Sequence, residues 1–455
     1  MNHHFAYIAI LFFLALFWAC KPSGKVAVAP QSMDKAPNWA RNLSIYEVNT
    51  RQYSDKGTFS AVEADLPRLK KMGIGIVWFM PITPIGEKGR KGTFGSYYAV
   101  QNYTAVNPDY GTIEDFKNLV HKAHELGMYV IIDWVANHTS WDNPIAAEHP
   151  EWYTKDKDGN FQPPVADWSD VIDLDYNNAE LRKYMIEAMA FWVKECDIDG
   201  FRADVAEMVP TDFWEQARAK IDPIKPLFWL AESEKAEHHT KAFDASYGWE
   251  LHHLLKDVVQ GNKNVTDLYA YFDRTAETFP SDAYRLYFTT NHDENSWNGT
   301  EKEKFGEGAA ACFVLCATAP GSMPLLYTAQ ESQLDRRLKF FEKDPVEWRD
   351  YPMTSFYTAL LQLKQSNPAL WDGKWGGKMT RIATTNDKSV MAFVRQNDKN
   401  KVFVVLNLGG GNENVQLNGS DYEGEYHSAF SGKPQTFKAN QTLSLKAWEY
   451  QVWVK

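Results

Sequence analysis

The chain has 455 residues, a net charge of −11 and a composition of 44% hydrophobic and 24% charged residues. This balance excludes wholesale disorder, and the length suits a domain of about 250 residues or more with a smaller second domain. The acidic balance and the lack of a basic run argue against a nucleic-acid partner.

The first segment of the chain has the pattern of an export signal. Residues 5–19 form an unbroken apolar run, shorter than the roughly 20 residues needed to span a bilayer. We interpret residues 1–19 as a signal peptide and the polar residues 20–38 as a tether. The run ends in Phe17-Trp18-Ala19-Cys20, which resembles a bacterial lipoprotein box. We therefore expect lipidation of Cys20 and an exported, membrane-anchored protein facing the periplasm or the cell surface; an ordinary secreted protein is the alternative.

The remaining cysteines are odd in number and cannot all pair. Cys312 and Cys316 lie four residues apart in an Ala-rich helical pattern, a spacing poor for a disulfide and typical of core residues. With Cys196, they are predicted to be buried thiols outside any metal site.

Strand-like runs alternate with helical patterns from residue 44 to about residue 341. The runs occupy residues 44–49, 74–80, 129–135, 200–205, 227–231, 245–249, 285–289 and 324–327, and the helical patterns include residues 112–126 and 178–195. This alternation predicts parallel βαβ units and an α/β fold. A closed (β/α)8 TIM barrel is favoured over a doubly wound sheet, because acidic residues stand at the C-terminal ends of many of the runs.

The predicted barrel occupies residues 39–138 and 178–372. Residues 139–177, rich in Trp, Pro, Asp and Gly, form an insertion after the third strand, and a long loop of this kind tends to be functional. Residues 373–455 contain alternating runs at 389–395, 401–408 and 443–454, separated by Asn, Gly and Asp. They predict a C-terminal antiparallel β-sandwich.

Four short motifs that contain acidic residues stand at the ends of strand-like runs. They are DWVANH, GFRADV, LAES and TTNHDEN, and they supply Asp133, Asp204, Glu232 and Asp293. Carboxylates from the ends of several strands meet at the mouth of a barrel, where such folds place their active sites. The pattern therefore indicates an enzyme.

In order and spacing, these motifs resemble those of the α-amylase superfamily of glycoside hydrolases, and Asp173-Leu174-Asp175 resembles a weaker fifth motif. The resemblance extends from Trp39 to the C-terminus. It implies a retaining hydrolase of α-linked glucans such as starch or maltodextrins. The alternatives are a transglycosylase or isomerase on the same scaffold, handling trehalose or sucrose, and an inactive glycan-binding lipoprotein.

Retaining hydrolysis needs a carboxylate nucleophile and a carboxylic acid. Asp204 suits the nucleophile, because Arg202 two residues earlier faces the same side of a strand and can hold it ionised. Glu232, in an apolar and aromatic context, suits the acid; its neighbour Glu234 is the competing assignment, but the resemblance implies Glu232. The resemblance also implies that Asp293 is a third catalytic carboxylate.

The resemblance further implies substrate-binding roles for Tyr98, His138, Arg202 and His292, with Asp133 as a structural partner of Arg202. The reaction requires no cofactor. A structural calcium is left open: Asn137 is a candidate ligand, but Met208 stands where many members carry a His that helps to bind the ion.

Overall fold

The computed structural model describes residues 35–455, so the predicted signal peptide and Cys20 lie outside the described residues. Within the described part, eight parallel strands close into a barrel in the order β1-β10-β9-β8-β7-β6-β3-β2. The barrel strands are β1 (Ile45–Val48), β2 (Ile76–Phe79), β3 (Tyr129–Trp134), β6 (Gly200–Ala203), β7 (Phe228–Ala231), β8 (Ala245–Tyr247), β9 (Tyr284–Tyr287) and β10 (Ser322–Tyr327). Each overlaps one predicted run, and the predicted TIM barrel is confirmed.

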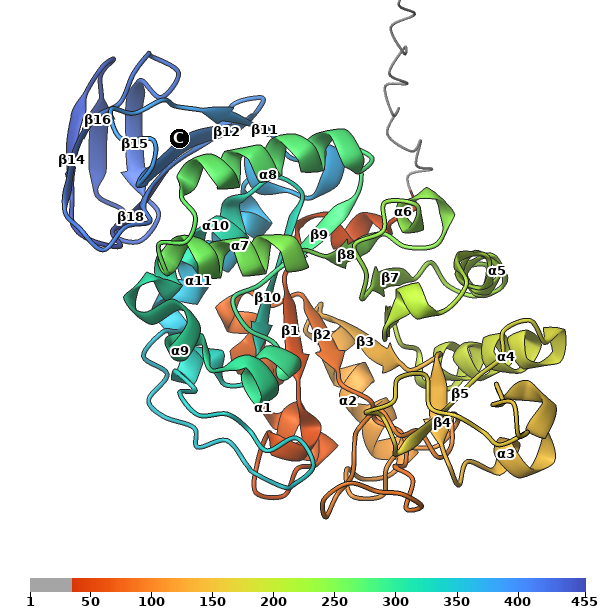
Figure 1. Cartoon of the computed structure of the whole chain (residues 1–455). Coiled ribbons are helices and arrows are strands. Elements are labelled where there is room, and N and C mark those ends of the chain that lie inside the picture. Colours follow the sequence, from red (N-terminus) through yellow and green to blue (C-terminus); the bar gives the residue numbers. More distant parts are fainter. Residues whose placement is uncertain (1–34) are drawn as a thin grey trace, which may run out of the picture.

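Helices surround this barrel (Figure 1). They are α1 (Phe59–Met72), α2 (Ile113–Glu125), α4 (Ala179–Cys196), α5 (Thr211–Ile221), α6 (His238–Lys241), α7 (Trp249–Val259), α8 (Val265–Thr278), α9 (Glu301–Phe305), α10 (Ala309–Thr318) and α11 (Thr354–Ser366). Capping side chains fix the N-terminal ends of several of these helices. Thr112 and Asp115 form a reciprocal capping box at α2, and the Asn178 side chain caps α4. Among residues 35–455, none of the helices has the length and apolarity needed to cross a membrane.

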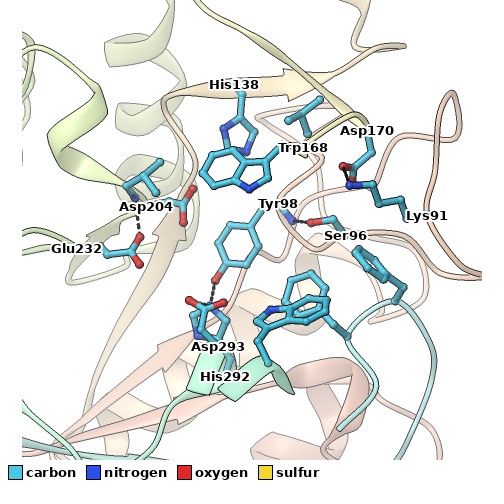
Figure 2. Close-up of a pocket in the computed structure, with 15 residues that line it drawn as sticks. Lys91, Ser96, Tyr98, His138, Trp168, Asp170, Asp204, Glu232, His292 and Asp293 are labelled. Carbon is cyan, nitrogen blue, oxygen red and sulfur yellow. Dashed lines mark hydrogen bonds and ion pairs between the residues drawn. The ribbon is translucent and has the colours of Figure 1, made fainter. Parts of the chain in front are cut away.

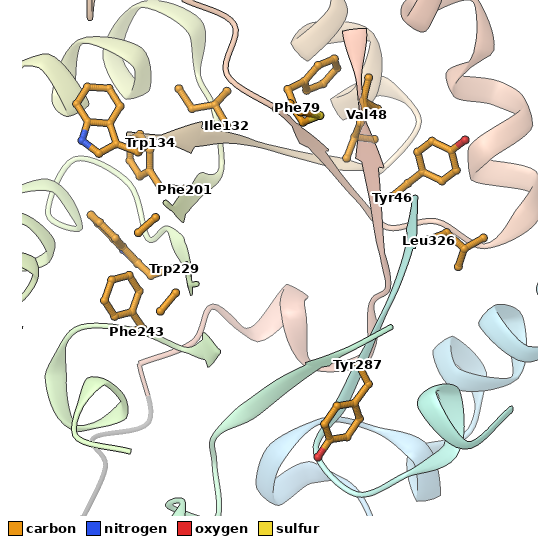
Figure 3. Packing of buried hydrophobic residues seen from close by; sticks show 14 of the residues in the cluster. Tyr46, Val48, Phe79, Ile132, Trp134, Phe201, Trp229, Phe243, Tyr287 and Leu326 are labelled. Atoms are coloured by element: carbon orange, nitrogen blue, oxygen red, sulfur yellow. The ribbon is translucent and has the colours of Figure 1, made fainter. Parts of the chain in front are cut away.

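Side chains along each barrel strand alternate between two cores. Tyr46, Phe79, Ile132 and Trp229 point outward into the layer under the helices, part of which Figure 3 shows. Their neighbours in the same strands, among them Ile45, Trp78, Ile131 and Leu230, fill the barrel interior. Because the side-chain period of a strand is two, continuing the interior set toward the C-terminal ends brings polar residues onto the barrel axis.

The insertion after β3 is built on two short antiparallel strands, β4 (His138–Ser140) and β5 (Val171–Asp173). Between them lie α3 (Pro144–Glu148) and a turn of 3-10 helix at Pro150–Trp152. β4 begins four residues after β3 ends, so the insertion lies beside the C-terminal mouth of the barrel (Figure 1).

The C-terminal region forms a six-stranded antiparallel sheet, β11-β12-β13-β18-β15-β16, and a two-stranded sheet, β14-β17. The strands are β11 (Lys378–Arg381), β12 (Val390–Asn397), β13 (Asn400–Asn407), β14 (Glu413–Gln416), β15 (Gly424–Ser428), β16 (Pro434–Phe437), β17 (Thr442–Leu445) and β18 (Tyr450–Val454). Val415 of β14 and Leu445 of β17 share a core with Val390 and Phe403 of the larger sheet, so the two sheets pack face to face.

Several boundaries differ from prediction by two residues, and one predicted strand is divided. Residues 443–454 are not one strand, because the chain turns at Trp448, whose φ is 57°, and passes from β17 in one sheet to β18 in the other. β8 ends at Tyr247, two residues early, because Trp249 already begins α7. The three predicted thiols, Cys196, Cys312 and Cys316, are free and buried as expected.

Candidate active site

The interior positions of the barrel change from apolar to charged at the C-terminal ends of the strands. Glu47 follows Ile45 by two residues, Asp133 follows Ile131 in the same way, and Glu232 follows Leu230. Strand alternation therefore directs all three carboxylates toward the barrel axis. Arg202 of β6 lies in register with Asp133 of β3, and its side chain is fully buried.

Arg202 holds three carboxylates at the bottom of the site. Its Nη1 lies 2.9 Å from Asp133 Oδ1 and 2.8 Å from Asp204 Oδ1, and its Nη2 lies 3.0 Å from Glu232 Oε2. Its Nε donates to the Tyr247 hydroxyl at 3.1 Å. The planar guanidinium therefore fixes the positions of the predicted nucleophile and the predicted acid relative to each other.

Burial sets the protonation of these acids. It raises the pKa of Glu232 to about 7, against the opposing charge of Arg202. It also raises the pKa of Asp133 to about 7 and raises that of Asp204, again with Arg202 opposing. A carboxyl that keeps its proton near neutral pH can act as a general acid, so Glu232 has the property that this role needs.

The backbone after the predicted nucleophile also positions Glu232. Val205 has a φ of 36° and lies in the left-handed region, which is unusual for a β-branched residue. In this conformation its amide donates to Glu232 Oε2 at 2.7 Å. Such strain costs about 1–3 kcal/mol and typically occurs where a functional site requires it.

Tyr98 and His292 form a second hydrogen-bonded group beside Asp204. The Tyr98 hydroxyl lies 2.7 Å from His292 Nε2 and donates to Asp133 Oδ2 at 3.1 Å. His292 Nε2 also lies 3.3 Å from Asp293 Oδ2, and its Nδ1 contacts the buried carboxylate of Glu47. Burial lowers the pKa of His292, but Asp293 and Glu47 outweigh this effect and raise it to about 9, so the ring is cationic at neutral pH.

A cavity of about 260 Å³ lies above these groups. Six of the seven predicted site residues line it: Tyr98, His138, Asp204, Glu232, His292 and Asp293 (Figure 2). The seventh, Arg202, lies beneath the cavity and contacts Asp204 and Glu232, which line it. Burial lowers the pKa of His138 to about 4, so this ring is neutral and can hydrogen-bond a sugar hydroxyl. The competing acid Glu234 instead pairs with Arg285 at 2.9 Å.

Sequence reasoning missed several residues of the site. Glu47 could have been found, because an acid at the end of the apolar run Ile45–Val48 follows the pattern of the other motifs. No comparable local pattern in the sequence identifies the other missed residues, which are Tyr247, Lys91, Asp170 and the aromatic residues that form the rim of the cavity. The rim comprises Trp168, Trp297, Phe340 and Phe341.

Asn137, the candidate calcium ligand, contacts neighbouring residues of the insertion. The Asn137 carbonyl accepts from the Leu174 amide at 3.1 Å, and its side-chain nitrogen lies 3.4 Å from His138 Nδ1. The Asp156 carboxylate accepts from Asp158 and Asn160 within its own turn. Residues 35–455 contain no group of three or more His, Cys, Asp or Glu side chains placed to hold a metal ion. Calcium also takes carbonyl oxygens as ligands, so the structural calcium stays a prediction.

The chain resembles known proteins over most of its length. The model of the α-amylase catalytic domain matches residues 36–168 and 150–372, and that of the α-amylase SusG C-terminal domain matches residues 390–450. A relative named α-amylase 2, from Dictyoglomus thermophilum, is 26% identical over 450 residues, covering 88% of this chain and 75% of its own length.

Two solved structures match the fold closely. A noncanonic maltogenic α-amylase from Thermotoga neapolitana has a TM-score of 0.82 and 32% identity, covering 91% of this chain and 98% of its own. An α-amylase from Lactobacillus plantarum has a TM-score of 0.83 and 32% identity, covering 92% and 99%.

Proposed function

Because the chain belongs to the α-amylase family of glycoside hydrolases, we propose that Asp204 and Glu232 cleave α-glucosidic bonds of starch or maltodextrins with retention of configuration. The observation that carries this assignment is the contact of one buried guanidinium, that of Arg202, with both carboxylates. Retaining glycosidases use two such carboxyl groups on either side of the scissile bond.

In the first step, the Asp204 carboxylate attacks C1 of the sugar while Glu232 donates its proton to the departing glycosidic oxygen. The C1–oxygen bond to the leaving chain breaks as the ester bond to Asp204 forms. In the second step, Glu232 takes a proton from water, the water oxygen attacks C1, and the Asp204 carboxylate is released. The salt bridge from Arg202 to Asp204 favours the ionised nucleophile, and the raised pKa of Glu232 favours the protonated acid.

Other residues of the site bind the sugar on which the reaction occurs. The ring of Tyr98 offers an aromatic face to the glucose unit, since its hydroxyl is already held by Asp133 and His292. His138 presents a ring nitrogen to the sugar hydroxyls, and the cationic ring of His292 lines the cavity beside them. Asp293 places a further negative charge beside a centre that becomes positive in the transition state.

Product analysis tests this function. The protein is incubated with starch, maltoheptaose, pullulan, a cyclodextrin and trehalose, and the products are separated by chromatography. Hydrolysis of the α-linked glucans to products released in the α-configuration, observed by NMR, is the expected result. Products released in the β-configuration would contradict the retaining mechanism, and new linkages in place of hydrolysis would indicate a transglycosylase.

We also propose that Cys20 anchors the protein to a membrane through a lipid, facing the periplasm or the cell surface. The support is the sequence alone: the apolar run of residues 5–19 ends at Cys20, and a polar segment follows. The test is Cys20→Ser, which should move the protein from the membrane fraction to the soluble fraction. A Cys196→Ser variant, which changes a buried thiol of the barrel, is the control and should stay with the membrane.

A further inference from the structure

An ion pair between two segments that are far apart in the sequence lines one end of the cavity. Lys91 Nζ lies 3.1 Å from Asp170 Oδ1, and both residues line the cavity. Lys91 lies between β2 and α2, whereas Asp170 directly precedes β5 of the insertion. Figure 2 shows this pair on one side of Tyr98 and Glu232 on the other.

Lys91 belongs to a segment, residues 86–95, that we call the strap. Its sequence is GEKGRKGTFG. On one side, Lys91 Nζ also donates to the Asp167 carbonyl at 2.6 Å, which strengthens the link to the insertion. On the other side, the Phe94 amide donates to the Phe341 carbonyl at 2.9 Å, and the Thr93 amide donates to Glu342 Oε1 at 3.0 Å. The strap therefore connects the insertion to the loop after β10.

Close packing fixes the path of the strap. A Cβ at Gly92 would lie 2.6 Å from Phe341 Cβ, and Gly92 also has a φ of 63°, so only glycine fits there without strain. A Cβ at Gly86 would lie 2.2 Å from Ser140 Cβ in β4. The Glu87 amide donates to Asp142 Oδ2 at 2.8 Å, and Arg51 Nη1 donates to the Gly95 carbonyl at 3.0 Å. The strap is thus held at both ends and against both walls.

The positions of the acid and the strap define the direction of the substrate. A general acid lies beside the leaving group, which in a glucan is the part of the chain toward the reducing end. The side of Tyr98 opposite Glu232 therefore holds the part toward the non-reducing end. This step rests on the proposed role of Glu232.

We propose that the strap blocks the non-reducing-end side of the cleft, so that the enzyme attacks glucans from their non-reducing ends and releases a short product of fixed length. Lys91 and Asp170 offer charged hydrogen-bonding groups to the terminal hydroxyls of the chain. Trp297 is half exposed, lines the same cavity with its ring centroid 5.1 Å from that of Phe340, and offers a broad face on which a sugar can stack.

Two substrates of equal length test the direction of attack. One is p-nitrophenyl α-maltoheptaoside, and the other is the same compound with its non-reducing end blocked by a 4,6-ethylidene group. The full chain is incubated with each, and consumption is followed by chromatography at the absorbance of the nitrophenyl group. We expect the blocked compound to be consumed at least about tenfold more slowly, since its end cannot fit against the strap. Equal rates would overturn the inference while leaving the proposed function intact; consumption of neither would overturn both.

Variants of the strap test its role. Lys91→Ala removes the ion pair with Asp170 and the hydrogen bond to the Asp167 carbonyl, and replacement of residues 88–91 by two glycines shortens the strap. Either change should raise the consumption rate of the blocked compound relative to that of the unblocked compound by about fivefold or more. Lys88→Ala, at an exposed position of the strap that does not line the cavity, is the matched control and should leave the ratio unchanged. An unchanged ratio in both strap variants, with melting temperatures close to wild type, would overturn the inference.

Discussion

Glu47 at the end of β1 and His292 after β9 form an ion pair beneath the cavity, with the imidazole Nδ1 against the carboxylate. The Glu47 side chain is fully buried, and burial raises its pKa while the imidazolium opposes that effect. Because the pKa of His292 is about 9, its cationic ring can donate from both nitrogens, one toward Glu47 and the other toward Tyr98 and Asp293. Glu47 is therefore a positioning residue that acts through His292.

Glu47→Gln should lower the pKa of His292, because the carboxylate that favours the imidazolium is lost. Activity should then fall about tenfold more at pH 8 than at pH 6, where the ring still takes up a proton. An NMR titration of the His292 ring measures the pKa directly. Glu331→Gln is the control: Glu331 is also a buried acid, paired with Arg68 at 2.7 Å, and does not line the cavity. A pKa that stays at about 9 in Glu47→Gln would contradict this role.

The same pair predicts how stability depends on pH. The folded-state pKa of His292 is raised from 6.5 to about 9, so its contribution to stability is complete below pH 6.5 and is lost as the pH rises through about 9. The melting temperature of the wild type should therefore fall more over this interval than that of Glu47→Gln. Parallel curves for the two proteins, measured by calorimetry, would contradict the linkage.

Asp204→Asn should lower kcat by several orders of magnitude, because it removes the nucleophile and leaves the shape of the side chain almost unchanged. A 5-fluoro-α-glycosyl fluoride, whose ester with the enzyme hydrolyses slowly, should label the peptide that contains Asp204, as detected by mass spectrometry. The variant should not be labelled. Labelling of another carboxylate would show that the nucleophile lies elsewhere.

Glu232→Gln should cause a similar loss on starch but a much smaller loss on an α-maltosyl fluoride, because fluoride leaves without a proton. Glu234→Gln is the matched control, since Glu234 pairs with Arg285 and should retain activity within about threefold of wild type. Equal losses on both substrates would exclude Glu232 as the acid.

The pH profile of kcat/KM reports the pKa of Glu232 in the free enzyme. Only protonated Glu232 can donate, and its pKa is about 7, so activity should decline as the pH rises through about 7. Asp204 must be ionised to attack, so activity should also decline as the pH falls and Asp204 takes up a proton. The alkaline limb should appear with a maltooligosaccharide substrate and be absent with the α-maltosyl fluoride, which needs no proton from Glu232. An alkaline limb of equal size on both substrates would assign it to another group.

Chelation should leave both the melting temperature and the activity unchanged. The Asn137 carbonyl and Asp156 Oδ1 already accept from backbone amides, and no acidic cluster accompanies them in the described part of the chain. Calorimetry and starch hydrolysis with and without EDTA provide the measurement. A melting temperature that drops with EDTA and recovers with Ca²⁺, but not with Mg²⁺, would reveal a calcium site.

The amino-acid sequence by itself determined the barrel and six of the residues that line the cavity, among them the catalytic carboxylates Asp204, Glu232 and Asp293. Both depend on local periodicity: apolar runs of strand length alternate with capped helices, and Asp204 follows Arg202 at the spacing that puts two side chains on one face. Parallel strands joined by helices share one carboxyl edge, so acids at several strand ends must meet.

Only the tertiary structure decided how those residues are supported and how the cleft is closed. Glu47 and His292 are separated by 245 residues, and Lys91 meets Asp170 through the packing of the insertion against the strap. The left-handed Val205 and the separation of β17 from β18 are likewise imposed by distant partners. Local spacing carries no information about such contacts, because their energies arise when segments far apart in sequence pack together.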